Sequence, residues 1–235
     1  MEKLQEIAEQ FYNALIPQQR YLAYLDGLKM TLLISFFAVI LGVTIGVVVA
    51  MIRVTAKNGK SVLLKILSKI CSIYVTLFRS TPLIVQLMII YYMIFTSRDT
   101  NPIIVGMVCF GMNSGAYVSE IVRAGIESID RGQTEAGRSL GFTTMQTMRY
   151  IILPQAIKNI LPALGNEFIV LVKETAAISV IAINDLTKMA GFIGSRTYKP
   201  LPPYIIAAVI YLIIVLILTK FLNMFERRLA KSDNH

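Results

Sequence analysis

The sequence predicts an all-α integral membrane protein with five transmembrane helices, and three observations carry this prediction. Hydrophobic residues make up 55% of the 235 positions and charged residues only 16%, whereas soluble domains hold about 45–50% and 25%. The apolar residues are gathered into uncharged runs long enough to cross a bilayer. Lys and Arg lie mainly between these runs, which is typical of loops that fix membrane orientation.

The apolar runs place the predicted crossings along the chain. The first covers 30–52, and its 23 uncharged positions form a helix about 34 Å long, enough for a ~30 Å hydrocarbon core. Further runs cover 80–97, which extends back to Ile70 if Arg79 is tolerated, then 100–119 and 200–219.

The fourth crossing falls in 150–184 and is polar. Prolines and charges interrupt it at Pro154, Lys158, Pro162, Glu167, Lys173 and Glu174. An ionisable group at the membrane centre costs about 2.5–3.5 kcal/mol on insertion scales, so it should face protein or water. This crossing is therefore less certain as a membrane span, and it is the span in which we expect functional residues.

The distribution of Lys and Arg predicts the orientation. Fourteen of them lie within 53–69, 123–158 and 220–231, against seven within 1–29, at Arg98 and within 188–199. The positive-inside rule then puts the N-terminus outside and the C-terminus in the cytoplasm. We expect residues 1–27 to form an amphipathic segment at the outer interface and 229–235 a cytoplasmic tail.

Composition also argues against other functions. The net charge of +9 does not indicate nucleic acid, because the basic residues separate apolar runs instead of sharing a face with aromatic residues. Cys71 and Cys109 lie inside apolar runs, and the single histidine is the last residue. We therefore expect no metal site, no catalytic residues and no disulfide framework.

One cytoplasmic segment has the spacing of a mechanical element. The stretch Glu135–Gly141 predicts a short helix, and Gly141 permits a sharp reversal. A second helix should follow and re-enter the membrane near Pro154, where the missing N–H breaks helical continuity. A short helix held at the membrane face is suited to receive force from a partner, although an ordinary loop between two crossings is the simpler alternative.

This segment resembles the EAA loop of binding-protein-dependent ABC importer permeases. The family pattern is Glu-Ala-Ala, three residues, Gly, nine residues, then Ile-x-Leu-Pro, and it fits from Glu135 to Pro154 except that Gly137 replaces the usual Ala. The resemblance implies a coupling helix seated in a cleft of an ATPase subunit. The ATPase-coupling residues it implies are Gln133, Glu135, Ala136, Gly137, Leu140 and Gly141.

The resemblance extends over about 28–228. Residues 78–86 (FRSTPLIVQ) are similar to the FRGTPLLVQ stretch of polar amino-acid permeases, 115–126 to their AYxxEIxRGGI stretch and 132–136 to GQxEA. The segments 153–156, 165–168 and 171–175 follow in the expected order. The chain is thus identified as a member of the polar amino-acid uptake family, of the histidine, glutamine and arginine permease type, with the type I ABC importer permease fold.

Membership in that family implies a set of partners. These are an ABC ATPase subunit dimer, a second permease subunit (identical or paralogous), an extracytoplasmic solute-binding protein, an amino-acid substrate and the lipid bilayer of a bacterial plasma membrane. The domain 28–228 would hold the translocation path, with the coupling loop at about 130–154. ATP and Mg would be bound by the partner ATPase, so this chain is expected to be no enzyme and to need no cofactor.

Six polar residues are candidates for substrate contact: Glu167, Asn166, Thr81, Gln86, Asn113 and Ser114. Polar groups beside a helix break at membrane depth are typical of translocation sites, and Pro162–Gly165 predicts such a break. Pro82 frees the carbonyl of Phe78, four residues back, and predicts a kink in the second crossing. The alternative is structural: Arg79, Lys173, Glu167 and Glu174 would pair among themselves.

Two small-residue patterns, Gly42-xxx-Gly46 and Gly111-xxx-Gly115, predict close helix packing.

The functional alternatives are an ABC permease for another small solute and an ATP-independent carrier or channel. A carrier or channel that works without ATP would not need a docking helix around Glu135.

Overall fold

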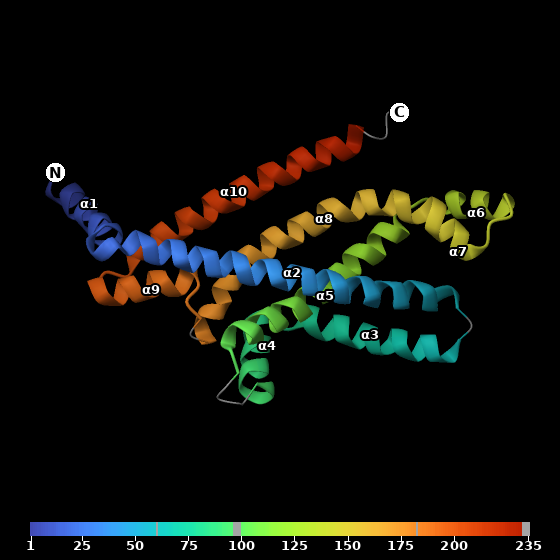
Figure 1. The fold of residues 1–235 in the computed structure, drawn as a ribbon, viewed down its shortest axis with the longest axis horizontal. Helices are drawn as coiled ribbons and strands as arrows, with labels where there is room; N and C mark the ends of the chain where they lie inside the picture. Colours follow the sequence, from blue (N-terminus) through green and yellow to red (C-terminus); the bar gives the residue numbers. More distant parts are fainter. Residues whose placement is uncertain (60, 96–99, 182, 232–235) are drawn as a thin grey trace. The chain divides into compact units, whose positions relative to one another are not determined.

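The structure is helical throughout its described part. The computed structural model describes residues 1–59, 61–95, 100–181 and 183–231, and these ranges contain no strand. The α-helices are α1 (Glu2–Leu15), α2 (Arg20–Asn58), α3 (Val62–Ser80), α4 (Leu83–Ile89), α5 (Pro102–Glu127), α6 (Arg131–Ser139), α7 (Thr144–Thr147), α8 (Leu153–Glu174), α9 (Leu186–Thr197) and α10 (Leu201–Lys231) (Figure 1). Two 3-10 turns cover Pro17–Gln19 and Thr175–Ile181, and two π-helical turns cover Ile90–Ile94 and Met148–Ile152.

The all-α prediction is therefore confirmed. The end of the second predicted run at 96–97, the charges Lys60 and Arg98, and residues 232–235 of the predicted tail lie outside the described residues.

Three helices in the described ranges are long and apolar enough to cross a membrane: Pro17–Lys57, Pro102–Glu127 and Leu201–Leu229. They contain the whole of the predicted first run, and the third and last runs from Pro102 and Leu201 onward. The interrupted pair Val62–Ser80 and Leu83–Ile94 adds a fourth if it forms one crossing. Helix α8, which holds the predicted fourth crossing, is not among these apolar helices and carries four charged residues.

The second predicted run, 80–97 with its extension back to Ile70, is bent at Pro82, where the helices on either side meet at 112°. Helix α3 ends at Ser80, and Thr81 is extended, with φ −120° and ψ 148°. Pro82 explains this ending, because a proline excludes the α conformation from the residue before it. A new helix, α4, begins at Leu83.

The predicted helix break at Pro162–Gly165 is wrong, because α8 continues from Leu153 to Glu174 with Pro162 inside it. Packing on both sides holds the helix together. A Cβ at Gly125 would lie 2.4 Å from Ile160 Cγ1, and one at Gly165 would lie 2.4 Å from Leu222 Cδ1. Gly165 therefore leaves room for the Leu222 side chain, and packing against neighbouring helices compensates for the hydrogen bond that Pro162 cannot donate.

The sequence predicts that Pro154 breaks helical continuity, but the helical path runs through it. The π-helical turn Met148–Ile152 runs directly into α8, and the N–H of Leu153 bonds the carbonyl of Met148. The wider turn changes the register just where the proline ring would clash with the carbonyl four residues back.

The chain forms two compact units. Unit 1 comprises Met1–Ala38, Leu83–Phe110 and Ile169–Thr219. Its core joins the end of α1, the start of α2, α9 and α10 through Ala14, Tyr24, Leu186, Ala190, Ile193 and Ala207. The start of α9 is fixed by Asp185, whose carboxylate accepts the N–H groups of Thr187 and Lys188 at 3.0 and 2.9 Å. Burial raises the pKa of the Asp185 carboxyl, and these two N–H donors oppose the rise.

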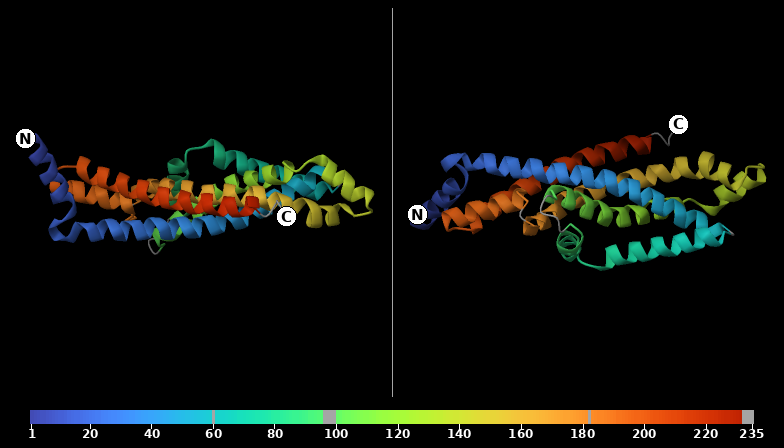
Figure 2. Two further views of the ribbon diagram at one scale, coloured as in Figure 1. Left: turned by 90° about the horizontal axis from the view of Figure 1, so that it is seen from above. Right: turned by 60° about the horizontal axis from the view of Figure 1, so that its bottom comes forward.

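Unit 2 comprises Val39–Pro82, Gly111–Phe168 and the chain from Lys220 onward. Within it α3 runs back along the C-terminal part of α2 (Figures 1 and 2). Its main core is formed by Ala50, Val118, Val122, Ile126, Ile152, Ala156 and Ile160.

The two glycine pairs interlock α2 with α5 inside unit 2. A Cβ at Gly42 would lie 2.8 Å from Ser114 Cβ, and one at Gly46 would lie 2.5 Å from Val118 Cγ1. In return, Gly111 and Gly115 of α5 receive Leu41 and Ile45 of α2. The predicted close helix packing is confirmed, and it occurs within one chain.

We expect Gly46→Val to destabilise the protein by roughly 1–3 kcal/mol, because the added methyl groups force α2 away from α5. The measurement is the melting temperature of the purified chain in detergent. Val118→Ala in the same background should restore part of the loss, since it removes the clashing side chain. Val48→Leu is the control, because Val48 is 55% exposed; an equal loss from that variant would contradict the packing explanation.

Candidate functional site

The first candidate site is the hairpin built from α6 and α7. Asp130 begins α6 by accepting the N–H of Gly132 at 2.7 Å. Gly141 lies at φ +84°, a conformation that favours glycine, and reverses the chain. The predicted short helix and its reversal are both present.

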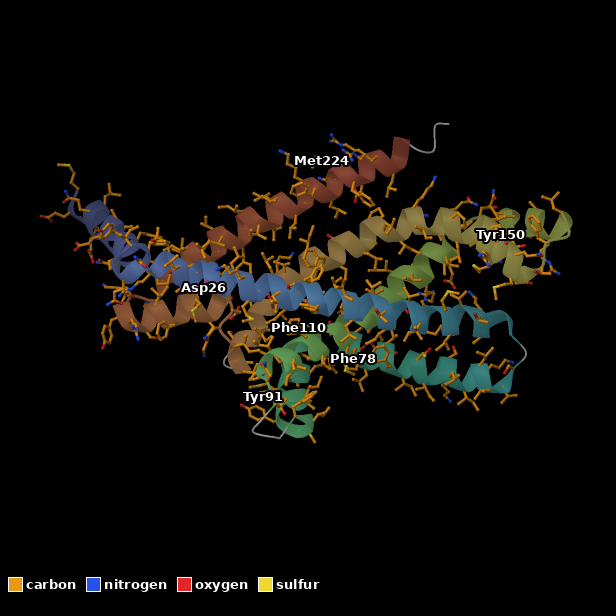
Figure 3. The ribbon with its side chains drawn as sticks, in the orientation of Figure 1. Asp26, Phe78, Tyr91, Phe110, Tyr150 and Met224 are labelled. Atoms are coloured by element: carbon orange, nitrogen blue, oxygen red, sulfur yellow. The ribbon has the colours of Figure 1, made fainter. Side chains whose placement is uncertain are left out.

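The second arm of the hairpin is capped and braced. The hydroxyl of Thr143 accepts the N–H of Gln146, while the Gln146 side chain accepts the N–H of Thr143 at 2.8 Å. Between the arms, Arg138 donates to Thr144 at 3.1 Å. The π-helical turn that follows carries Tyr150 (Figure 3) and continues into α8.

Gly137 is where the two arms touch. It is buried, and a Cβ there would lie 2.8 Å from both Thr147 Cγ2 and Ile151 Cδ1. The departure from Ala therefore serves packing: the missing methyl lets α6 approach the turn that leads into α8. The other predicted coupling residues, Gln133, Glu135, Ala136, Leu140 and Gly141, are exposed.

Behind α6 the hairpin leaves a cavity of about 620 Å³. Arg131, Thr134 and Glu135 line it from α6, and Lys57 and Glu127 line it from the ends of α2 and α5. On this side α6 stands off from the ends of α2 and α5, and its contacts at Gly137, Arg138 and Gln133 join it to α7, the π-helical turn and α8.

The second candidate site is a buried carboxylate. Glu167, on α8, is 9% exposed, and its Oε1 accepts a hydrogen bond from Ser114 Oγ of α5 at 2.9 Å. The structure therefore brings two of the six predicted substrate residues into direct contact. Asn166, the residue before Glu167 on α8, is exposed.

Two more of the six lie at the end of α3. The Asn113 amide donates to the carbonyl of Phe78 at 3.2 Å, and the Thr81 hydroxyl donates to the carbonyl of Leu77 at 2.8 Å. The carbonyl of Phe78 (labelled in Figure 3) has no helical donor, because the residue four positions on is Pro82, which lacks an N–H. The sixth residue, Gln86, is buried in α4.

Sequence reasoning did not single out Glu120, which is the centre of a charge network in unit 2. It pairs with Arg53, with Arg123 at 2.6 Å and with Arg79 at 3.7 Å. Arg123 also contacts Glu127, which Lys57 reaches at 2.8 Å. The sequence does contain a pattern that predicts part of this network. Glu120, Arg123 and Glu127 are spaced by three and then four residues, which puts all three on one helical face.

This network corrects the alternative in which Arg79, Lys173, Glu167 and Glu174 pair among themselves. Arg79 pairs with Glu120 and lies 5.2 Å from the ring centre of Tyr117. Among the described residues, neither Lys173 nor Glu174 takes part in an ion pair.

Comparison with known families decides what kind of protein carries this hairpin. A family described as "Binding-protein-dependent transport system inner membrane component" matches residues 42–231. The chain belongs to this family. It is therefore a multi-pass inner membrane component, and the ATPase of such a system is a separate subunit.

Curated relatives of this inner membrane component span nearly its whole length. It is 39% identical over 224 residues to the arginine transport system permease protein ArtQ of Bacillus subtilis, covering 94% of this chain and 98% of the relative. It is 36% identical over 208 residues to the glutamine transport system permease protein GlnP of Escherichia coli K12, covering 87% and 92%.

Solved structures agree on the fold. A chain of an amino acid ABC transporter with histidines is 47% identical and superposes with a TM-score of 0.81, covering 88% of this chain and 94% of that one. A chain of the MetNI methionine ABC transporter superposes with a TM-score of 0.78 at 21% identity, covering 91% and 99%, which supports the fold alone. The predicted all-helical ABC importer permease fold is confirmed.

We expect Glu120→Gln to lower the stability of this inner membrane component by about 1.5–3 kcal/mol, because three arginines lose their shared carboxylate. The measurement is the thermal midpoint of the detergent-solubilised protein. Glu127→Gln is the matched control on the same helix face: its side chain is 35% exposed against 18% for Glu120, so the loss should be smaller. Equal losses would contradict a central role for Glu120.

Proposed function

We propose that this chain is the permease subunit of an ATP-driven importer for polar amino acids. The observation that carries the proposal is the exposed α6 hairpin joined to α8, the helix that bears the buried Glu167. Membership in the family of binding-protein-dependent inner membrane components supports the importer assignment. The names of the arginine and glutamine relatives support the substrate class.

Coupling would begin at the exposed face of α6. A partner ATPase that closes on ATP would grip the surface formed by Gln133, Glu135, Ala136, Leu140 and Gly141. The displacement would pass through Gly137, where α6 touches Thr147 and Ile151, into the π-helical turn.

From that turn the force would reach the transport site along one helix. Helix α8 is continuous from Leu153 past Glu167, and fourteen residues at 1.5 Å each span about 21 Å. Because this helix is unbroken, a displacement of the cytoplasmic hairpin would also displace the Glu167 carboxylate. The membrane subunits would rock around this site, and the substrate would move without covalent change.

The Glu167 carboxylate would hold the ammonium or a cationic side chain of the substrate. Its burial excludes water, and its hydrogen bond from Ser114 fixes one oxygen toward α5. A carboxylate held in place in this way favours a cationic group, because the attraction is stronger where water is excluded. Asn166, Thr81, Gln86, Asn113 and Ser114 remain the proposed polar lining.

The assembly would comprise two membrane subunits, an ABC ATPase dimer and an external solute-binding protein. The surplus of Lys and Arg in 53–69, 123–158 and 220–231 supports five crossings, with the N-terminus outside and the C-terminus inside. A permease for another small solute is the alternative, and the similarity to the arginine and glutamine permeases favours amino acids.

We expect Glu135→Lys to uncouple ATP hydrolysis from uptake, because it reverses a charge on the exposed face of α6. The assembled transporter in proteoliposomes should keep most of its ATPase activity while substrate accumulation falls at least about tenfold, a loss equal to 1.4 kcal/mol of coupling. Glu226→Lys makes the same charge reversal on α10 and serves as the control. Normal uptake by Glu135→Lys would refute the docking role of α6.

We expect Glu167→Gln to weaken uptake of a cationic amino acid more than that of a neutral one. Losing a buried charge pair of about 2 kcal/mol corresponds to roughly thirtyfold in affinity. Uptake of labelled arginine and glutamine by the same proteoliposomes measures the ratio. Glu174→Gln, seven residues along the same helix, is the control. An equal effect of Glu167→Gln on both substrates would remove Glu167 from the substrate role.

A further inference from the structure

A cationic groove in unit 2 borders the cavity behind α6, with which it shares Lys57 and Glu127, but it contains no residue of the hairpin and does not include Glu167. It has a volume of about 330 Å³ and lies between the end of α2, the first turns of α3 and the end of α5. It is lined by Arg53, Val54, Ala56, Lys57, Lys65, Ser68, Ser72, Arg123 and Glu127.

The charges of the groove do not balance. Arg53, Lys57, Lys65 and Arg123 face one lining carboxylate, Glu127. Glu120 lies behind the groove and pairs with Arg53 and Arg123, but even with Glu120 counted the cations exceed the carboxylates by two. A surplus of this kind at one point favours an anion.

Among the polar side chains that line the groove, Lys65, Ser68 and Ser72 donate no hydrogen bond to another described residue. Among the described residues Lys65 takes part in no ion pair, whereas the other three cations do. Ser68 and Ser72 follow at three and seven residues, so all three share one face of α3. An ammonium beside two hydroxyls suits the oxygens of a phosphate group.

The position of the groove, at the end of an apolar membrane-spanning run, favours a lipid phosphate as its ligand. Arg53 is the first charged residue after the apolar run 30–52, which is where a helix leaves the hydrocarbon core. Next to the groove, α3 exposes apolar side chains that could lie along acyl chains: Ile66 is 53% exposed, Ile70 58% and Ile73 60%. Basic pockets between helices at this depth bind anionic headgroups.

We propose that this groove binds the phosphate of an anionic glycerophospholipid, with Lys65, Ser68 and Ser72 as ligands and the acyl chains along α3. The site lies on the permease itself and does not depend on the substrate that the permease carries. Bound lipid would neutralise the surplus charge between α2, α3 and α5.

The test is lipid binding to the assembled transporter. The complex is purified with its ATPase, stripped of lipid with detergent and mixed with phosphatidylglycerol or phosphatidylcholine, and bound lipid is counted by native mass spectrometry. We expect phosphatidylglycerol to be retained in preference. Lys65→Gln should reduce its affinity roughly fivefold, the contribution of one basic residue near an anionic headgroup.

The controls separate this site from general surface charge. Lys69→Gln removes a cation from the same helix outside the groove and should leave binding unchanged. Ser68→Ala with Ser72→Ala should weaken binding while all charges remain. The melting temperature of each variant in phosphatidylcholine should equal that of the parent, which shows that the variants fold.

Several results would overturn the proposal. Equal retention of both lipids, or equal losses from Lys65→Gln and Lys69→Gln, would remove the groove as a specific site. Complete displacement of phosphatidylglycerol by inorganic phosphate would assign the groove to a free anion. Loss of the ATPase from Lys65→Gln during purification, with lipid binding unchanged, would assign it to an acidic protein surface.

Discussion

The close crossing of α2 and α5 is the constraint on which unit 2 depends. Glycines on each helix receive side chains of the other, so the two backbones approach more closely than larger residues would allow. Gly42 faces Ser114, and this missing side chain leaves room for the serine hydroxyl to reach Glu167. One turn further along the crossing, Gly46 receives Val118. The same pairing positions Glu120 within reach of Arg53, so the ion network and the buried carboxylate both follow from it.

Helix α8 is the element that links the two candidate sites. Two prolines in its sequence predict interruptions, yet the helical path runs from the hairpin to Glu174. The π-helical turn absorbs Pro154, and packing of Ile160 and Gly165 against neighbouring helices holds the stretch around Pro162. Tertiary contacts therefore override a strong local signal, because the chain keeps helical hydrogen bonds wherever neighbours make up for the lost ones.

Much of the fold could be predicted from the sequence, because apolar run length and small-residue spacing act locally. The runs at 30–52, 100–119 and 200–219, the short helix at Glu135 and the reversal at Gly141 all occur as expected. What could not be predicted depends on partners distant in sequence. No local pattern says that Glu120 meets Arg53 and Arg79, or that a helix tolerates Pro162. Gly137 shows the same limit: propensity makes it a weak helix residue, and only the structure reveals the neighbours that require it.

The end of α3 ties two helices together by a backbone requirement. The Phe78 carbonyl is released by Pro82, and Asn113 of α5 donates to it. A buried carbonyl without a hydrogen-bond donor costs about 1–3 kcal/mol of stability. A second bond joins the same helices, because Tyr74 of α3 donates to the Met112 carbonyl of α5. Sliding α3 past α5 would break both bonds at once. These two bonds therefore favour movement of α3 and the adjoining part of α5 as one unit.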